Sequence, residues 1–466
     1  MSDPHSTLLW LRHDLRLADN PALQAAIQRG SVLPVYLWAP QEEGGWPPGA
    51  ASRWWLHHSL RSLASDIAAR GGTLMVRDAS REGSLRALQE ILSRYGADGV
   101  CWNLRFEPGV LKRDAAIETA LRAAGYWTQA CNGALLSDPR ELKNQSGDPY
   151  QVFTPYWRRA LELLGEPPAP QPAPGRLPAV VAAQVPIDAV LEHIDGLGLL
   201  PLVDWDKGLA ATWQPGEGAA RQRLERFGAR ALAGYDANRN RPDLEGTSRL
   251  SPHLHFGEIS PRQVWHATSR AAKRSGSSAS HRESQFVTEL GWREFAHYML
   301  FHYPHTPERP LRAQFERFAW ADDSSALQAW QHGRTGIPIV DAGMRQLWRE
   351  GWMHNRVRMI AASLLVKNLQ VNWLEGARWF WDTLVDADLA SNTLGWQWVA
   401  GCGADAAPYF RIFNPQAQAQ KFDPDGAYRR RWVPEAADAT RYPQPIINLK
   451  TSRIAALSAY AGMRDA

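Results

Sequence analysis

A short run of hydroxyl-bearing residues around one arginine is the clearest candidate for anion binding in this chain. The run consists of Thr247, Ser248, Arg249, Leu250 and Ser251. We expect a helix to open after it, at Pro261. Hydroxyls and backbone N–H groups near the start of a helix bind phosphate groups, and an arginine adds positive charge. The run therefore predicts a diphosphate site, although an ordinary helix cap uses the same residue types.

A second polar segment, at 385–398, contains two carboxylates separated by one residue. It begins Val-Asp-Ala-Asp and ends Trp-Gln-Trp, and it contributes Asp386, Ala387, Asp388 and Asn392. Buried carboxylates require partners, so the two aspartates predict a polar site if the segment is buried. Taken alone, the pattern is equally typical of a surface loop. Trp396 and Trp398 are two positions apart, about 200° around a helix, and must point in different directions.

The first 131 residues alternate short apolar runs with amphipathic ones. The pattern predicts strands at 8–11, 32–38, 73–76, 99–102 and 126–131, separated by helices at 21–28, 53–69, 84–95 and 111–124. Such alternation is typical of an α/β domain with a five-stranded, doubly wound parallel sheet, here residues 1–132. No Gly-x-Gly-x-x-Gly follows the first strand, so we expect a large cofactor to bind elsewhere.

The remainder of the chain divides into a linker and a helical part. Six prolines between Pro167 and Pro178 favour an extended linker over residues 133–205, and 150–154 is expected to pack back onto the body. After Glu217 the pattern is almost wholly helical, which predicts an all-α domain at 206–466.

Composition excludes several classes of protein. The net charge of +4 and a pI near 9.0 permit a basic patch without requiring one. The three cysteines lie far apart with no Cys-x-x-Cys, which argues against a disulfide framework or a zinc site. No signal peptide or membrane span is evident. We expect a cytoplasmic monomer with no metal.

The segments 247–251 and 385–398 together resemble the two FAD-holding segments of the photolyase/cryptochrome family. The resemblance extends from Leu9 to about Arg453. It implies an α/β domain and an all-α C-terminal FAD-binding domain joined by a long linker. It also implies that Tyr235 and residues 247–251 hold the FAD phosphates and ribitol, while Asp386 and Asp388 bracket the isoalloxazine and ribose.

Two further flavin contacts are implied by the resemblance. Arg358 stands where the family pairs an arginine with the aspartate at Asp386. Asn392 stands where a side chain faces N5 of the flavin. An amide there does not readily supply a proton, unlike the aspartate of plant cryptochromes, so it favours the anionic reduced flavin.

The segment beginning at Glu289 resembles the part of the family that contacts a pyrimidine dimer. Glu289 and Trp292 are three apart and share one helix face, where they could hydrogen-bond and stack on a lesion, and Arg293 follows them. Trp398 would supply a second aromatic wall. Without the resemblance, a Glu-x-x-Trp pair is more typical of a helix surface meeting a core.

The lesion itself is predicted from Asn355 and Met359, which share a helix face. Photolyases acting on (6-4) photoproducts have histidine at both positions, and we expect the adjacent His354 to point away. The resemblance therefore favours cyclobutane pyrimidine dimers (CPDs), whose splitting needs an electron and no proton. The positions implied to contact DNA phosphates or the lesion are Arg239, Arg356 and Arg411.

Trp320, Trp373 and Trp396 match the family's tryptophan chain, which reduces photoexcited oxidised flavin. We expect them on three different helices. An antenna chromophore could bind among residues 12–14, Trp38, Trp46 and 103–107, which could equally be ordinary loop residues. The class resemblance implies methenyltetrahydrofolate, with a deazaflavin as the alternative.

The resemblance implies light-driven CPD repair in DNA by reduced FAD. The alternative is a cryptochrome photoreceptor without repair activity. Glu289 with Trp292, Asn392, and the absence of a long tail after Arg464 weigh against that alternative. The segment at 401–411 most resembles the photolyase class allied to plant cryptochromes. The sequence does not distinguish a preference for single-stranded DNA from one for duplex DNA.

Overall fold

The computed structural model describes residues 5–276, 280–406, 410–438 and 440–465. Its N-terminal part contains the predicted five-stranded parallel sheet, with strand order β3-β2-β1-β4-β5. The strands are β1 (His5–Leu11), β2 (Gly30–Trp38), β3 (Met75–Asp78), β4 (Gly99–Asn103) and β5 (Trp127–Cys131). Because the chain reverses direction of winding after β3, the carboxyl ends of β1 and β4 lie at the topological switch point, where α/β sheets bind ligands.

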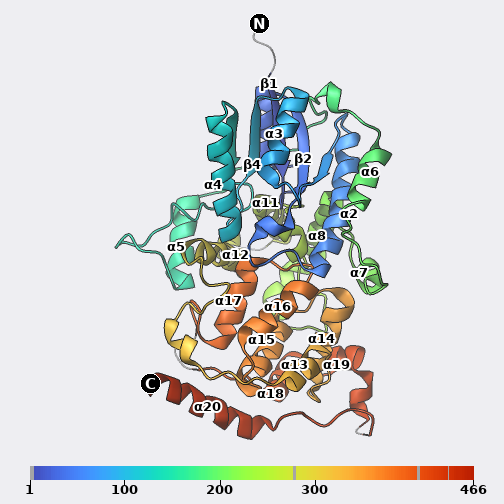
Figure 1. The fold of residues 1–466 in the computed structure, drawn as a ribbon. Helices are drawn as coiled ribbons and strands as arrows, with labels where there is room; N and C mark the ends of the chain where they lie inside the picture. Colours follow the sequence, from blue (N-terminus) through green and yellow to red (C-terminus); the bar gives the residue numbers. More distant parts are fainter. Residues whose placement is uncertain (1–4, 277–279, 407–409, 439, 466) are drawn as a thin grey trace.

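Both faces of this sheet are covered by helices, as the alternation predicted (Figure 1). Leu9 and Leu11 of β1 pack with the helices α1 and α2, whereas Leu8 and Trp10 pack with α3 and α4. This period of two follows from the pleat of a strand buried on both faces. The helices are α1 (Pro21–Arg29), α2 (Ala50–Ala68), α3 (Ser84–Tyr95) and α4 (Pro108–Ala123).

The predicted linker is less extended than its prolines suggested. It contains α5 (Phe153–Leu164), the 3-10 turn η2 (Val181–Ala183) and α6 (Ile187–Asp195). α5 forms because Phe153, Trp157 and Ala160 recur on one face and are buried, which outweighs the nearby prolines. The proline-rich stretch between α5 and α6 is extended and follows the sheet, where Val32 N donates to Pro178 O at 2.7 Å. The exact domain boundaries remain a prediction.

The rest of the described chain is helical, with one isolated bridge between Ala321 and Val371. Its longer helices enclose several clusters of buried hydrophobic residues, and the largest includes Trp330, Leu365 and Trp396. The elements are α7 (Lys207–Thr212), α8 (Glu217–Arg230), η3 (Leu232–Gly234), α9 (Tyr235–Asn238), α10 (Ser251–His255), α11 (Pro261–Arg274), η4 (His281–Glu283), α12 (Gln285–His302), η5 (Ala313–Arg317), α13 (Ser324–Gln331), α14 (Pro338–Glu350), α15 (Asn355–Ser363), the π-helical turn η6 (Leu364–Asn368), α16 (Trp373–Thr383), α17 (Leu389–Ala400), α18 (Pro415–Phe422), α19 (Ala427–Trp432), η7 (Pro434–Ala437) and α20 (Leu449–Asp465).

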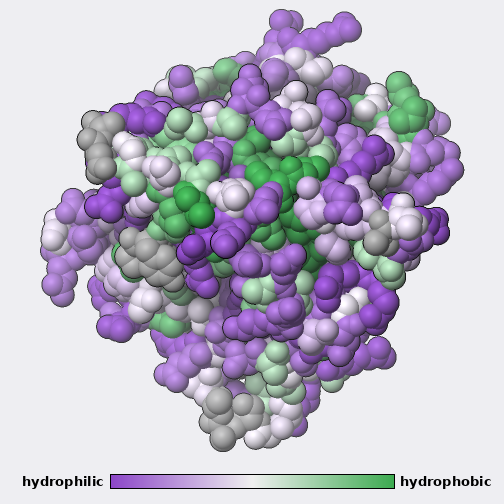
Figure 2. All heavy atoms as spheres, turned by 90° about the horizontal axis from the view of Figure 1, so that it is seen from below, coloured by the Kyte–Doolittle hydropathy of each residue, from purple (hydrophilic) through white to green (hydrophobic). Residues whose placement is uncertain are grey.

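α20 runs across the end of the molecule opposite the N-terminus (Figure 1). Its buried residues Ser452, Ala456 and Met463 face the body, while Ile454 remains exposed. Seen from this end, the surface is largely hydrophilic with a hydrophobic area near its centre (Figure 2). Among the described helices, none is long and apolar enough to cross a membrane.

Buried polar contacts join the sheet domain to the helical domain. Glu258 accepts hydrogen bonds from Trp55 Nε1 at 3.0 Å and from Gly216 N at 2.7 Å, and its other oxygen lies 2.5 Å from His253 Nδ1. Gly257 has φ +64°, and a Cβ at this position would lie 2.2 Å from His13 O. The helical domain is thus held close to the β1–α1 loop, which matters for the site described next.

Candidate functional site

A cavity of about 170 Å³ lies among α15, α16 and α17. Two of these helices begin at the cavity. The side chain of His354 caps the N-terminus of α15, and that of Asp388 caps the N-terminus of α17. The lining residues are Asn355, Arg358, Met359, Ala362, Phe380, Leu384, Asp386, Ala387, Asp388, Ser391, Asn392, Gly395, Trp396 and Val399. The structure therefore brings together eight predicted positions: Asn355, Arg358, Met359, Asp386, Ala387, Asp388, Asn392 and Trp396.

The ion pair predicted between Arg358 and Asp386 is present. Arg358 Nη2 lies 2.9 Å from Asp386 Oδ2, and Ser251 Oγ donates to the same oxygen at 2.6 Å. The other oxygen, Oδ1, is buried and has no partner in the described part of the chain. A buried carboxylate oxygen without a partner requires a donor. The N–H groups of a flavin could supply that donor, so this residue set fits FAD.

The hydroxyl-bearing run at 247–251 lies against the same site. The helix that follows it directly is not the one we expected. α11 does begin at Pro261, yet the run leads directly into the five-residue α10, which starts at Ser251. Pro252 is the second residue of α10, and the helix ends at His255, shortly before Gly257, whose positive φ breaks the helical geometry. The predicted phosphate contacts therefore lie in a loop and its first turn.

Arg249 has partners that the sequence did not reveal. Its φ is +51°, its Nη2 lies 3.2 Å from Glu350 Oε2, and its guanidinium stacks 4.4 Å from the ring of Trp352. Arg249 is thus paired with Glu350. Thr247, Ser248 and the backbone N–H groups are therefore more available to donate hydrogen bonds to a phosphate. Tyr235, on α9, packs its ring against Phe227 and Phe286.

Asp388 closes the cavity from the side of the sheet domain. Its Oδ1 accepts from Ser391 N at 2.7 Å, and its Oδ2 lies 3.3 Å from His297 Nε2. Burial opposes ionisation of this carboxyl, but the charge and hydrogen bond of His297 hold the pKa of Asp388 well below its usual range. The group is therefore a carboxylate at neutral pH.

Asn392 uses its amide nitrogen within the protein. Nδ2 donates to Ala377 O of α16 at 3.0 Å. The oxygen Oδ1 is then the atom left to face the cavity, as an acceptor. An acceptor at this place suits a flavin N5 that carries a hydrogen.

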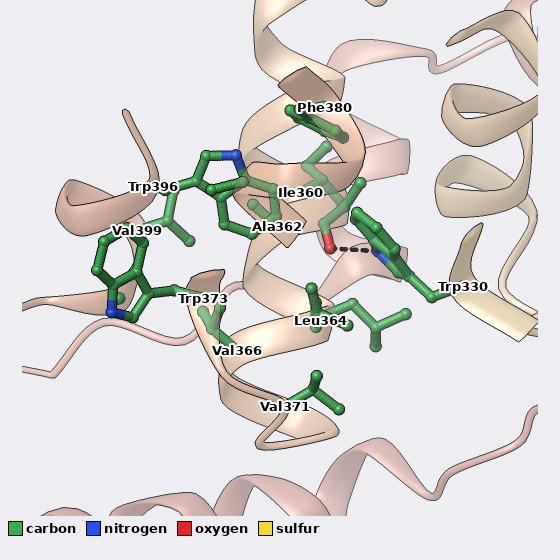
Figure 3. Packing of buried hydrophobic residues seen from close by; sticks show 14 of the residues in the cluster. Trp330, Ile360, Ala362, Leu364, Val366, Val371, Trp373, Phe380, Trp396 and Val399 are labelled. Carbon is green, nitrogen blue, oxygen red and sulfur yellow. Dashed lines mark hydrogen bonds between the residues drawn. The ribbon is translucent and has the colours of Figure 1, made fainter. Parts of the chain in front are cut away.

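The three predicted chain tryptophans occupy neighbouring segments. Trp396 is buried against Phe380 and Trp330, with ring centroids at 5.0 and 6.1 Å, and Trp373 begins α16 on the other side of Val399 (Figure 3). Trp320 lies in a loop rather than on a helix, which corrects the expectation of three helices. Its neighbour Ala321 donates to Gln370 O at 2.8 Å, and this contact brings Trp320 close to the start of α16.

The predicted lesion contacts are paired with the predicted DNA contacts. Arg239 Nη1 lies 2.6 Å from Glu289 Oε1, which also accepts from Gln285 Nε2 at 2.8 Å. Arg356 donates to Asn240 Oδ1 at 2.8 Å. Burial and the neighbouring charges of Arg239 and Arg411 lower the pKa of Arg356, so the three arginines share one electrostatic environment.

The aromatic lesion contacts lie outside the enclosed cavity. Trp292 stacks on Phe153 of α5, with centroids 3.9 Å apart and an interplanar angle of 9°, so one face of its ring is covered. Trp398 donates from Nε1 to Asp405 O at 3.2 Å and points away from Trp396, as the spacing predicted. Residues 407–409 of the predicted phrase 401–411 lie outside the described residues.

Arg293 has different surroundings from Arg239, Arg356 and Arg411. Its Nη1 donates to Ala134 O at 2.9 Å, and it lines a small cavity with His13, Arg105 and Asp388 at the boundary with the sheet domain. The structure therefore does not group Arg293 with Glu289, although the two are four residues apart, because α12 passes between the two domains.

A second cavity lies at the switch point of the sheet, where the antenna was predicted. It is lined by Arg12, His13, Trp38, Trp46, Arg105 and Glu107, among others. Asp14 and Asn103, predicted with them, instead hydrogen-bond each other at 2.6 Å. Ala387 lines this cavity as well as the one beside Asp386.

Sequence reasoning missed His297 and Glu350. His297 stands four residues after Arg293 on α12, where helical spacing places it on the face toward Asp388. That spacing was the available signal for His297. Glu350 is the last residue of α14, and nothing in its local sequence indicates that it would meet Arg249.

The chain matches two family models and several known proteins. Residues 7–175 match DNA photolyase, and residues 286–441 match the FAD binding domain of DNA photolyase. A deoxyribodipyrimidine photo-lyase of Agrobacterium fabrum is 44% identical over 98% of each chain. Cryptochrome-1 of Arabidopsis thaliana is 38% identical over 92% of this chain and 63% of its own length.

The fold is also shared with a solved structure. A bacterial class III photolyase from Agrobacterium tumefaciens superposes with a TM-score of 0.93 at 42% identity, covering 100% of this chain and 99% of that one. The chain belongs to the photolyase/cryptochrome family, and its helical part is the family's FAD-binding domain.

Proposed function

We propose that the protein repairs cyclobutane pyrimidine dimers in DNA under blue light. The observation that carries the proposal is the composition of the cavity lining. Asn355 and Met359 line it, and neither side chain can act as the acid that (6-4) repair requires. The relatives named deoxyribodipyrimidine photo-lyase support the same reaction.

Four residues in or beside the cavity would hold the cofactor. Arg358 and Ser251 orient Asp386, whose free Oδ1 would accept from the flavin, while Asn392 Oδ1 would accept from N5. Bound reduced FAD would supply the excited electron that opens the cyclobutane ring and that afterwards returns. Trp396 and Trp373 would carry electrons inward from Trp320 when oxidised flavin must be reduced.

Recognition of DNA falls to the mouth of the cavity. Arg239, Arg356 and Arg411 would neutralise phosphates, so binding should weaken with salt. A dimer pairs and stacks poorly, which lowers the cost of flipping it out of the duplex, as is known for photolyases in general. Glu289 and the open faces of Trp292 and Trp398 would hydrogen-bond and stack on it.

We also propose that the switch-point cavity binds an antenna chromophore, with methenyltetrahydrofolate favoured over a deazaflavin. Four of its lining residues, Trp10, Arg12, Trp46 and Ser52, have a buried polar atom without a partner in the described chain. Three of these atoms are N–H donors, so the occupant should offer acceptors, as pterins and flavins do. The enclosed volume is only about 40 Å³, so the lining must move apart for either ring. An absorption spectrum of gently purified protein distinguishes the two chromophores.

The repair proposal is tested by illuminating the reduced protein with oligonucleotides carrying each lesion. We expect restored pyrimidines from cyclobutane dimers and none from (6-4) photoproducts, read out by chromatography. Turnover of the (6-4) substrate alone would overturn the assignment of the cavity. Turnover of neither, with FAD bound and reduced, would favour a photoreceptor, in line with the likeness to Cryptochrome-1.

A further inference from the structure

His297 makes two buried contacts that favour its protonated form. Its Nδ1 lies 3.0 Å from Arg293 O, and its Nε2 lies 3.3 Å from Asp388 Oδ2. A backbone carbonyl can only accept, and so can a carboxylate. Neutral imidazole has one N–H and could satisfy only one of these partners. An imidazolium, with hydrogen on both nitrogens, satisfies both partners.

The alternative, a neutral His297 accepting from a protonated Asp388, conflicts with the other contact of that carboxyl. Asp388 caps α17 by accepting from Ser391 N, and the N-terminus of a helix favours a negative charge. The pKa of His297 is raised although burial opposes its charge, because Asp388 lies beside it. The pKa of Asp388 is lowered, so both shifts favour the charged pair.

Other titratable groups face this pair from neighbouring elements. From α10, His255 Nδ1 lies 3.8 Å from Asp388 Oδ2, and the ring of His13 meets that of His255 edge-on at 4.6 Å. Burial and the charge of Arg105 hold the pKa of His13 well below its usual range, so His13 is neutral. Glu107 binds Arg105 at 2.8 Å.

On α12 itself, Arg293 and Glu294 flank the pair. Arg293 donates to Ala134 O, and Glu294 accepts from Leu136 N at 2.9 Å and from Ser137 N at 3.1 Å. Both side chains are thus bound to the linker. Of the two histidines that lie beside Asp388 Oδ2, His297 is the nearer, at 3.3 Å against 3.8 Å for His255.

The cavity consequently contains two ion pairs, Arg358 with Asp386 and His297 with Asp388. With both pairs charged, the net charge of these four groups is zero. If His297 lost its proton, they would sum to one negative charge. A negative charge beside the cavity repels an anionic reduced flavin but does not repel a neutral oxidised one.

We propose that His297 is a positioning residue that acts through Asp388: as an imidazolium it balances the charge of the cavity and so favours reduced over oxidised flavin. The inference rests on the proposed placement of the flavin beside Asp388, and it does not depend on which substrate is repaired.

The test is a redox titration of bound FAD in the parent protein and three variants. His297→Gln keeps a hydrogen-bonding side chain but removes the charge, and His297→Arg restores a charge. His302→Gln is the matched control, because His302 lies on the same helix and binds only Pro139 O at 3.0 Å in the described chain.

His297→Gln should lower the affinity ratio of reduced to oxidised FAD about tenfold, which is about 30 mV for a two-electron couple. His297→Arg and His302→Gln should stay within about twofold of the parent on the same scale. An unchanged ratio in His297→Gln overturns the proposal, and so does an equal fall in His297→Arg.

A measurement on the parent protein covers the case in which His297→Gln loses its flavin. Nitrogen NMR of histidine-labelled protein should show both nitrogens of His297 protonated at neutral pH, and a neutral ring overturns the proposal. Loss of repair with the redox shift intact would count against the proposed function alone.

Discussion

Replacing Glu289 by alanine should weaken binding of the lesion and strengthen binding of undamaged DNA. The carboxylate holds Arg239 at 2.6 Å, and the two side chains are 29% and 18% exposed. Removing it deprives the dimer of an acceptor and frees a guanidinium beside Arg356 and Arg411. The two effects act in opposite directions on the two kinds of DNA.

The magnitudes follow from the partial exposure of the pair. Loss of a hydrogen bond in a desolvated site costs about 1–3 kcal/mol, and the exposed fraction of Glu289 favours the lower end. Affinity for the lesion should thus fall about fivefold, close to 1 kcal/mol. One additional phosphate contact steepens the salt slope by about 0.9, so the affinity for undamaged DNA should fall about threefold further between 50 and 200 mM salt.

Fluorescence anisotropy with lesion-bearing and undamaged duplexes, over a series of salt concentrations, measures both quantities. The matched control is Glu118→Ala, which frees Arg122 from a 2.6 Å pair on α4 of the sheet domain. An unchanged salt slope, or an unchanged affinity for the lesion, would refute the reasoning. An equal change in the Glu118→Ala variant would assign the effect to net charge alone.

Three further predictions concern the flavin cavity. Trp396→Phe should abolish photoreduction of oxidised FAD and leave repair by chemically reduced protein nearly intact. Because the residue is 3% exposed, the substitution should also lower the free energy of unfolding by about 1–2 kcal/mol. Equal loss of both activities would imply a structural role. Asp386→Asn should lower the flavin-to-protein ratio and the free energy of unfolding by about 2–4 kcal/mol, since it leaves Arg358 without its buried partner; an unchanged melting temperature would contradict this. Because the pKa of Asp388 is lowered in the folded protein, its carboxylate stabilises the fold above the usual carboxyl pKa of about 4. This stabilisation is lost as the pH falls through the lower pKa of the folded state. Parallel curves of stability against pH for the parent and Asp388→Asn would contradict this prediction.

The sheet domain was predictable from sequence because its signals are local. Each strand is a short apolar run with a helix after it, and the five runs alone imply parallel order and burial of both faces. The linker was read less well, since prolines dominate its composition while the buried face of α5 depends on contacts with α12. The charge partners of the site were the hardest part. Glu350 reaches Arg249, and His297 reaches Asp388, only after helices distant in sequence have packed together.

The structure contains the Arg358–Asp386 pair that the family resemblance implied, but other positions differ from what was expected. The run at 247–251 was assigned to the wrong helix, and Trp320 to a helix it does not occupy, because both positions depend on turns that follow them. Arg293 was grouped with Glu289 since helical spacing gives a face but not the domain that the face meets.

Ala387 lines both cavities and is 2% exposed. Among the described residues that line either cavity, it is the one they share. A larger side chain here must intrude on the space beside Asp386, on the space beside Trp46, or on both. Anyone redesigning the chain to accept another light-absorbing molecule therefore cannot treat the two chambers as independent. The residue at position 387 therefore belongs to the boundary between them, and its size limits how far either space can be enlarged toward the other.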